Sequence, residues 1–235
     1  MNLDDIPFSY GDLSGLEHRI IYYESSRGCP FPVVTVCPRL IKVRFRSLSL
    51  VTKELQFLDR RVPQVKFVDR TFNCKKSHSM AIWQYLLEHD NGITNFHFEI
   101  SSDLLDDDEL ALMKQMRPGL IQLEIGVQTT NLVVVKEIRR TMDLDKVARR
   151  VAQVNTFGNI HQHLDLIAGL PYEDIESFHR SFNDVYKMEP EQLQLGFLKV
   201  LKGSIWKKGS RNTVCSVRAS RRMRCLEPTG FPMKR

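Results

Sequence analysis

The chain has 235 residues, which is enough for one sizeable core, and its apolar (42%) and charged (26%) contents are ordinary for a globular protein. The net charge of +6 is local: residues 203–235 hold nine basic residues and one acidic residue, whereas residues 1–202 hold 25 basic and 27 acidic residues. The body of the protein is therefore not a polyanion binder, and no nucleic-acid partner is expected.

No apolar run in the sequence is long enough to span a membrane, so no membrane partner is expected either. The N-terminal residues have neither the basic region nor the apolar region of a secretory signal. The five cysteines are odd in number and scattered, which argues against a secreted disulfide framework. A cytoplasmic protein is the expectation, and the sequence leaves its oligomeric state open.

Short β-like runs alternate with amphipathic stretches from residue 43 to residue 200. The expected strands cover residues 22–25, 65–68, 95–100, 120–125, 160–167 and 192–198. Among the later strands the starts are 25 to 40 residues apart, a spacing typical of repeated βαβ units. This pattern predicts an α/β fold with a parallel sheet that is either doubly wound or curled into a barrel.

Helices are expected between these strands. An apolar face repeats at intervals of three and four residues around 48–58, and a second one covers 175–185 after Asp174. Asp106 and Glu109 form an acidic variant of a capping box at the start of another helix, which Pro118 and Gly119 end.

Polar or glycine-rich breaks follow four successive expected strands. They are Asp69–Arg70, Glu99, Gly126–Gln128 and Ala168–Pro171. In a parallel α/β sheet the ligand site lies at the carboxyl ends of the strands, so these breaks predict the rim of one site. The alternative is that such loops simply collect glycine and polar residues.

Five motifs occur in order along the chain: SSRGCPF at 25–31, FVDRTFN at 67–73, FEISSDLL at 98–105, LEIGVQTT at 123–130 and DLIAGLPYED at 165–174. Together they resemble radical S-adenosylmethionine enzymes of the type that also binds cobalamin. The resemblance covers residues 1–204 and implies a partial (βα)6 TIM-like barrel with parallel strands. It also implies a [4Fe-4S] cluster, S-adenosylmethionine and an electron donor of the flavodoxin or ferredoxin type.

Carried over by position, the resemblance assigns roles to residues of this chain. Cys29 matches the first of three cluster cysteines, and Glu99 matches a residue that contacts S-adenosylmethionine. Gly126 and Gln128 match a motif beside that cofactor, and Gly169, Leu170 and Pro171 match a turn beside its adenine. Two alternatives stay open: Glu99 could be a rim carboxylate paired with an arginine, and the glycines could serve tight turns.

Two other groups of residues receive no role in the cofactor site. His161 and His163 share a strand face and are read as barrel-lining residues rather than metal ligands. Cys74, Cys215 and Cys225 are assigned no ligand role.

The resemblance breaks in the cluster loop, residues 28–42. The family spacing places further cysteines four and seven residues after Cys29, but this sequence has Val33 and Val36 there. Cys37 is a doubtful replacement, because two thiolates eight residues apart do not make the three-point clamp. The loop as written is not expected to hold a [4Fe-4S] cluster, and the chain is expected to be inactive.

Degenerate codons suggest an explanation for this break. Reading from the third base of the Pro32 codon allows SCNCLSSIDK, which restores two cysteines, and the same shift from Val217 allows QGEPPYEVLGTDWLSYE, which removes the basic tail. We therefore hypothesise that residues 32–42 and about 205–235 are out-of-frame translations, so that 1–204 is the core barrel and 205–235 an ill-folded tail. The barrel also starts without the preceding cobalamin domain of its relatives, so a chain truncated at the N-terminus is expected.

The sequence supports a fragment of an oxidoreductase-like radical enzyme whose ancestral activity is reductive cleavage of S-adenosylmethionine to a 5′-deoxyadenosyl radical. The substrate and the outcome of the reaction stay undetermined. One rival is a non-catalytic relic barrel without a cluster that binds S-adenosylmethionine weakly. Another is an iron-free barrel enzyme, but no strand-end lysine and no phosphate-cradling glycine cluster supports it.

Overall fold

The structure is a computed structural model that describes residues 2–31, 42–59 and 62–199. The predicted frame-shifted segments cover residues 32–42 and 205–235. Apart from residue 42, these segments lie outside the described residues, and Cys37 is among the residues outside. Within the described part, no helix is both long and apolar enough to cross a bilayer.

A six-stranded sheet in the order β1-β4-β5-β6-β7-β8 organises the molecule, and all its pairs are parallel. The strands are β1 (Ile21–Tyr23), β4 (Gln64–Phe67), β5 (Asn95–Ile100), β6 (Ile121–Gln128), β7 (His161–Ala168) and β8 (Gln192–Phe197). All six expected strands are confirmed, and so is the partial barrel. One boundary was wrong: Gly126–Gln128 belong to β6 rather than to the loop after it, because β6 continues its pairing with β7 past Ile125.

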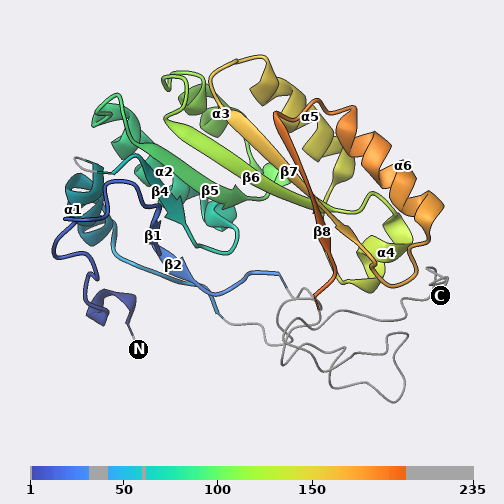
Figure 1. The fold of residues 1–235 in the computed structure, drawn as a ribbon, viewed down its shortest axis with the longest axis horizontal. Coiled ribbons are helices and arrows are strands. Elements are labelled where there is room, and N and C mark those ends of the chain that lie inside the picture. Colours follow the sequence, from blue (N-terminus) through green and yellow to red (C-terminus); the bar gives the residue numbers. More distant parts are fainter. Residues whose placement is uncertain (1, 32–41, 60–61, 200–235) are drawn as a thin grey trace.

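Helices line the sheet from α1 beside β1 to α6 beside β8 (Figure 1). They are α1 (Leu48–Asp59), α2 (Lys76–Glu88), α3 (Asp107–Met113), α4 (Leu132–Glu137), α5 (Leu144–Asn155) and α6 (Ile175–Tyr186). Three short 3-10 turns cover Leu3–Asp5, Phe72–Cys74 and Ser102–Leu104. The apolar faces expected at 48–58 and 175–185 are those of α1 and α6.

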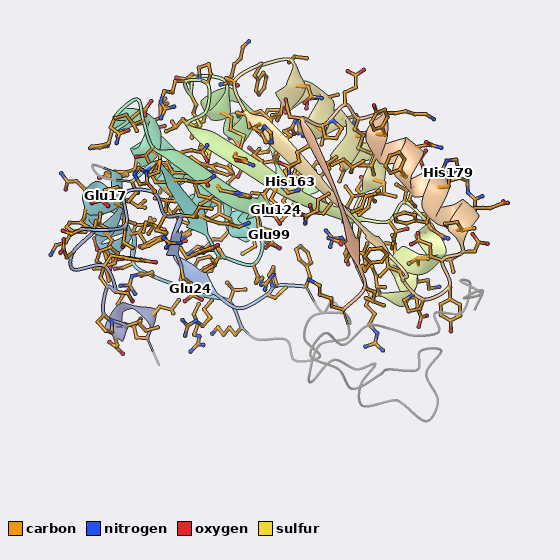
Figure 2. All side chains as sticks on the ribbon, in the orientation of Figure 1. Glu17, Glu24, Glu99, Glu124, His163 and His179 are labelled. Carbon is orange, nitrogen blue, oxygen red and sulfur yellow. The ribbon has the colours of Figure 1, made fainter. Side chains whose placement is uncertain are left out.

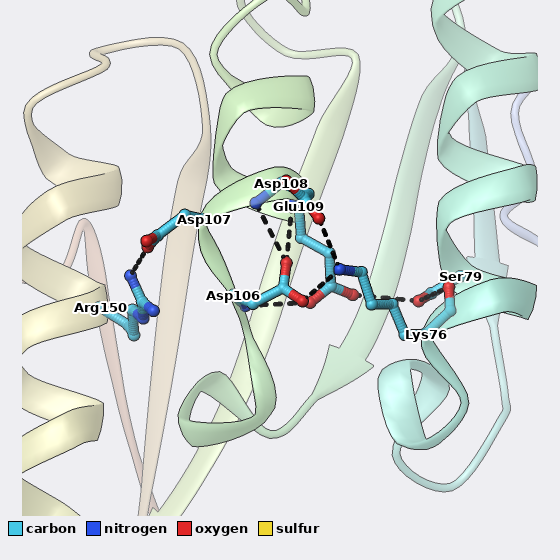
Figure 3. Close-up of polar contacts among 7 residues, drawn as sticks. All are labelled: Lys76, Ser79, Asp106, Asp107, Asp108, Glu109 and Arg150. Atoms are coloured by element: carbon cyan, nitrogen blue, oxygen red, sulfur yellow. Dashed lines mark hydrogen bonds and ion pairs between the residues drawn. The ribbon is translucent and has the colours of Figure 1, made fainter.

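The expected capping box opens α3. Asp106 accepts hydrogen bonds from the amides of Asp108 and Glu109, and the Glu109 carboxylate accepts one from the amide of Asp106. Lys76 reaches Asp106 and Asp108 from α2, and Arg150 on α5 meets Asp107 (Figure 3). Because acidic side chains at a helix N-terminus satisfy free amides and complement the helix dipole, this short helix has a well-defined start.

Successive side chains along each strand point alternately to the core and to the concave face of the sheet. On β6, Ile121, Leu123, Ile125 and Val127 are buried, whereas the residues between them are partly exposed. The buried set packs with side chains of the helices in one core, which includes an aromatic cluster with ring centroids 4.3 to 6.0 Å apart: Phe67, Phe72, Trp83 and Phe98. The other side chains of the strands therefore point to the inside of the half-barrel.

A small antiparallel pair closes the base of the loop that carries Cys29. β2 (Ser26–Arg27) precedes that loop and β3 (Arg44–Phe45) follows it, with Ser26 opposite Phe45 and Arg27 opposite Arg44. The two ends of the predicted cluster loop are thus held side by side.

Candidate functional site

The carboxyl ends of the strands surround a cavity of about 450 Å³. Five of the predicted site residues line it: Cys29, Glu99, Gly126, Gln128 and Leu170. Gly169 and Pro171 flank Leu170 but are not among the lining residues. Gly169 has φ of 85°, a left-handed conformation that favours glycine, so the structure shows a turn role for it.

The segment before Cys29 is anchored to the end of β4. The amide and hydroxyl of Ser25 donate to the Asp69 carboxylate at 3.0 and 2.8 Å, and the hydroxyl lies 3.0 Å from Nε2 of His78. All three side chains are buried. The carboxylate contacts the serine rather than the imidazole, unlike the order in a catalytic triad, and none of the three lines the cavity. This cluster is therefore a structural anchor for the loop.

Glu99 sits at the rim with a half-exposed side chain. Its Oε2 lies 3.6 Å from Nη1 of Arg70, so the arginine partner that the sequence left open is present, although the pair is loose. Burial raises the pKa of Glu99, and the positive charge of Arg70 counteracts this. A partly solvated pair of this kind contributes little stability, so Glu99 can exchange Arg70 for a ligand cation at low cost.

A bulge in β6 brings Gly126 and Gln128 to the cavity. The register with β7 shifts between these two residues, and Gln128 has φ of 72° although it is not glycine. A Cβ at Gly126 would collide with the amide of the Gln128 side chain. Oε1 of Gln128 is buried and has no hydrogen-bond partner within the described chain. Strained backbone and an unsatisfied acceptor at a cavity are typical of a ligand site.

Arg140 is a lining residue that the sequence did not reveal. Its Nη2 donates to the carbonyl of Gly126, and its buried Nε has no hydrogen-bond partner among the described residues. Burial lowers the pKa of Arg140, whereas the charges of Asp103 and Glu99 raise it. The residue follows α4 in a stretch without a recognisable motif, so only the folded chain places it at the cavity.

Glu124 and Asp165 form a second group of lining residues that sequence reasoning missed. Oε2 of Glu124 accepts from Nζ of Lys66 at 2.8 Å and from Nε2 of His97 at 2.9 Å. Nε2 of His163 lies 3.1 Å from Oδ1 of Asp165. Glu99, Glu124 and His163 lie near one another over the middle of the sheet (Figure 2). His163 is buried on the inner face, as its predicted barrel-lining role requires.

The described residues do not supply a ligand set for iron. Among them, no group of three or more His, Cys, Asp or Glu side chains could hold a metal ion. Cys29 is half-buried and its thiol donates to the Phe31 carbonyl at 3.3 Å. Cys74 is also half-buried, and burial raises the pKa of its thiol, which disfavours the thiolate form that binds metal.

Comparison with protein families decides what kind of barrel this is. The model of the radical SAM superfamily matches residues 26–185, more than half of the chain. The chain belongs to the radical SAM superfamily. Members of this superfamily use a [4Fe-4S] cluster and S-adenosylmethionine, so the expected cofactor class is confirmed at the level of the family.

Solved structures show that this radical SAM chain shares its fold with several enzymes. The radical S-adenosylmethionine methyltransferase TsrM from Kitasatospora setae, solved with cobalamin and a [4Fe-4S] cluster bound, has a TM-score of 0.71 at 12% identity. That match covers 86% of this chain and 40% of the other. Coproporphyrinogen III oxidase (HemN) from Escherichia coli has a TM-score of 0.58 at 20% identity, over 77% of this chain and 44% of that one.

Two curated relatives match a shorter part of this chain than the solved structures do. The oxygen-independent coproporphyrinogen III oxidase of Salmonella typhimurium is 26% identical over 59% of this chain and 31% of its own length. The Pseudomonas aeruginosa enzyme of the same name is 27% identical over 47% of this chain and 23% of its own length. The radical SAM chain therefore matches less than a third of these relatives.

The two cofactors of the family fit this site unequally. For S-adenosylmethionine the cavity offers the carboxylate of Glu99 and two groups without hydrogen-bond partners in the described chain. These are the buried Nε–H of Arg140 and the amide oxygen of Gln128. For the cluster, the sequence has valine at positions 33 and 36, and the described residues offer one loop thiol, that of Cys29. The described residues fit S-adenosylmethionine, and they do not by themselves fit a [4Fe-4S] cluster.

Proposed function

We propose that the described half-barrel is the S-adenosylmethionine-binding core of a radical SAM enzyme, and that the chain as translated binds this cofactor without cleaving it. The observation that carries the proposal is the convergence of Glu99, Gln128 and Arg140 on one cavity beside Cys29. S-adenosylmethionine is a zwitterion at its methionine end, and Glu99 and Arg140 offer opposite charges to its ammonium and carboxylate.

The other predicted residues complete this binding mode. The absence of a side chain at Gly126 leaves room for the Gln128 amide, whose free oxygen would accept from a cofactor hydroxyl or amine. Leu170 lines the cavity between Gly169 and Pro171, and the adenine would lie beside this turn. Cys29 would be one cluster ligand in an intact loop.

Titration calorimetry of the purified chain with S-adenosylmethionine tests the proposal. Arg140→Met is expected to weaken binding about 10- to 100-fold, the equivalent of one hydrogen bond to a charged group. Arg150 contacts Asp107 and Gln153 and does not line the cavity, so Arg150→Ala should leave the affinity unchanged. Equal affinities of wild type and Arg140→Met, or no binding by the wild type, would contradict the proposed site.

The ancestral activity that we propose is reductive cleavage of S-adenosylmethionine to a 5′-deoxyadenosyl radical, with an electron from a flavodoxin- or ferredoxin-type donor in the cytoplasm. The valines at 33 and 36 argue against this activity in the chain as it stands. We attribute these valines to a frame shift over residues 32–42, within the core of residues 1–204, and the basic tail to a second frame shift from about residue 205. Sequencing the gene across both junctions tests this, because well-supported in-frame codons would exclude it.

A further inference from the structure

The segment that follows β4 runs along the rim of the cavity between two buried anchors. At its start, Asp69 accepts hydrogen bonds from the amide and the hydroxyl of Ser25 at 3.0 and 2.8 Å. At its end, the Asn73 side chain donates to the Ser101 carbonyl at 2.9 Å and accepts from the Ser101 amide at 3.0 Å. Asp69 and Asn73 are 1% and 4% exposed. Both ends of the segment are therefore fixed by contacts to other loops of the rim.

Thr71, between these anchors, has a strained backbone. Its φ and ψ are 62° and 74°, in the left-handed region. A β-branched residue is a genuine outlier there, because its Cβ is too close to the neighbouring carbonyl oxygen. Such a conformation persists only where the surrounding structure imposes it, and strained residues cluster at ligand sites. Glycine would adopt this backbone without strain, so the threonine side chain lowers the stability of the segment.

The Thr71 side chain lines the cofactor cavity. Its hydroxyl makes no capping hydrogen bond to the 3-10 turn Phe72–Cys74 that follows it, so the local turn does not account for this residue. The same cavity is lined by two groups with buried atoms that lack partners within the described chain, Arg140 through Nε and Gln128 through Oε1. Because buried polar atoms are normally hydrogen-bonded, these two groups independently indicate a ligand in the cavity that Thr71 faces.

Thr71 lies at the end of the cavity that holds Glu99. Its neighbour Arg70 reaches the Glu99 carboxylate, with 3.6 Å between Nη1 and Oε2. Leu170, beside the proposed position of the adenine, belongs to the loop after β7, and β5 and β6 separate that strand from β4 in the sheet. Three strand spacings of about 4.8 Å amount to roughly 14 Å. Thr71 is therefore on the side of Glu99 rather than on the side of the adenine.

We propose that Thr71 is a ligand-contact residue whose hydroxyl binds the methionine end of S-adenosylmethionine, and that its strained conformation is held for this contact. The inference rests on the proposed cofactor site and deepens it, since it sets the methionine end beside β4 and β5 and the adenine beside β7. A hydroxyl both donates and accepts, so it suits the ammonium and the carboxylate of that end. Removing the side chain should then raise stability and lower affinity, which a purely structural residue would not do.

Calorimetric titration of the full chain with two ligands tests the inference. S-adenosylmethionine has both ends, whereas 5′-methylthioadenosine keeps the adenosine and lacks the amino and carboxylate groups. Thr71→Val keeps the β-branched shape and removes the hydroxyl, so it should weaken S-adenosylmethionine binding about tenfold, the equivalent of one hydrogen bond. Its affinity for 5′-methylthioadenosine should be unchanged. Thr71→Ser, which keeps the hydroxyl, should bind both ligands as the wild type does.

Thr71→Gly adds a second readout, the melting temperature. It removes the hydroxyl and also relieves the strain, so it should lose the same tenfold in affinity while its melting temperature rises by about 2 to 4 °C. Glu189→Gly is the matched control. Glu189 has φ of 52°, is exposed and does not line the cavity, so this variant should also melt at a higher temperature but keep both affinities.

Three results would overturn the inference while leaving the proposed function in place. They are wild-type affinity for S-adenosylmethionine in Thr71→Val, an equal loss of both ligands in that variant, and a lower melting temperature in Thr71→Gly. No binding of either ligand by the wild type would overturn the proposed function and this inference with it. The two failures are therefore distinguishable in one set of titrations.

Discussion

The pKa values of two neighbouring carboxyl groups on the inner face, Asp165 and Glu124, are shifted in opposite directions. Burial and the negative charge of Glu124 together raise the pKa of Asp165 to about 7. Hydrogen bonds from His97 and Lys66 lower the pKa of Glu124 despite its burial. Environments that separate two carboxyl pKa values in this way are typical of functional sites, and here they leave Asp165 able to gain or lose a proton near neutral pH.

The Asp165 titration can be observed directly by carbon-13 NMR of the aspartate carboxyls. We expect a midpoint near pH 7 in the wild type, and a lower one in Glu124→Gln, because the neighbouring negative charge is gone. An Asp165 midpoint close to the ordinary 3.8 in the wild type would contradict the geometry described here.

The same shift has a consequence for stability. The folded state holds the Asp165 proton more tightly than the unfolded state, whose ordinary pKa is 3.8, so this group's contribution to stability falls as pH rises from about 4 to about 7. Asparagine does not titrate. Asp165→Asn should therefore gain stability relative to the wild type over that range, as followed by urea unfolding. Asp107→Asn, at an exposed position, should show no such trend.

At the scale of elements, α3 depends on its first residue. Asp106→Ala removes the N-cap acceptor and the Lys76 partner, and it should cost about 1 kcal/mol of the free energy of unfolding. Asp107→Ala is the matched control. Its carboxylate is 90% exposed and meets only Arg150 among the described residues, so a loss below about 0.5 kcal/mol is expected in the same denaturant experiment. Equal losses in the two variants would show that the cap is not what defines this helix.

The strands were predictable because they are short β-like runs that alternate with amphipathic stretches, and the Asp106 capping box was predictable because its signal is local. The end of β6 was not predictable from the sequence, since Gly126 and Gln128 look like a loop but continue the pairing of β6 with β7 through a bulge. The site was half predictable. Glu99 and Gln128 belong to motifs, whereas Arg140 reaches the cavity only because the turn after α4 folds back onto the Gly126 carbonyl.

The Lys66–Glu124 and His97–Glu124 contacts lay beyond sequence reasoning for a related reason. They join side chains on three strands, β4, β5 and β6, whose relative stagger is set by the barrel. Alternation along one strand shows that these residues share a face, but it does not show which of them meet.

At the scale of the whole molecule, a buried ion pair joins the N-terminal segment to the barrel. Arg46 binds Glu54 of α1 and donates to the carbonyls of Leu3 and Ile6 at 2.7 and 3.0 Å, while the Tyr23 hydroxyl donates to Glu54 at 2.6 Å. Both charged side chains are less than a tenth exposed. The pair thus ties together three segments that are distant in the sequence, namely the N-terminal segment, β1 and residues 46–54.

Removing one partner of this pair should destabilise the protein far more than removing both. Glu54→Leu leaves the Arg46 charge buried without its counter-ion and should cost about 3 to 5 kcal/mol, whereas Arg46→Met combined with Glu54→Leu should cost less than the single change. Thermal or denaturant unfolding of the three proteins measures this. A double variant that is less stable than Glu54→Leu would contradict the buried-pair account.

The central proposal is that this radical SAM barrel retains an S-adenosylmethionine site and lacks the ligands for a cluster. Iron counting after anaerobic reconstitution of the purified chain tests it most directly. With valine at positions 33 and 36, we predict close to zero iron per chain and no charge-transfer absorbance in the visible range. Close to four irons per chain, with S-adenosylmethionine cleaved on reduction, would contradict the account and show that other thiols rebuild the cluster site.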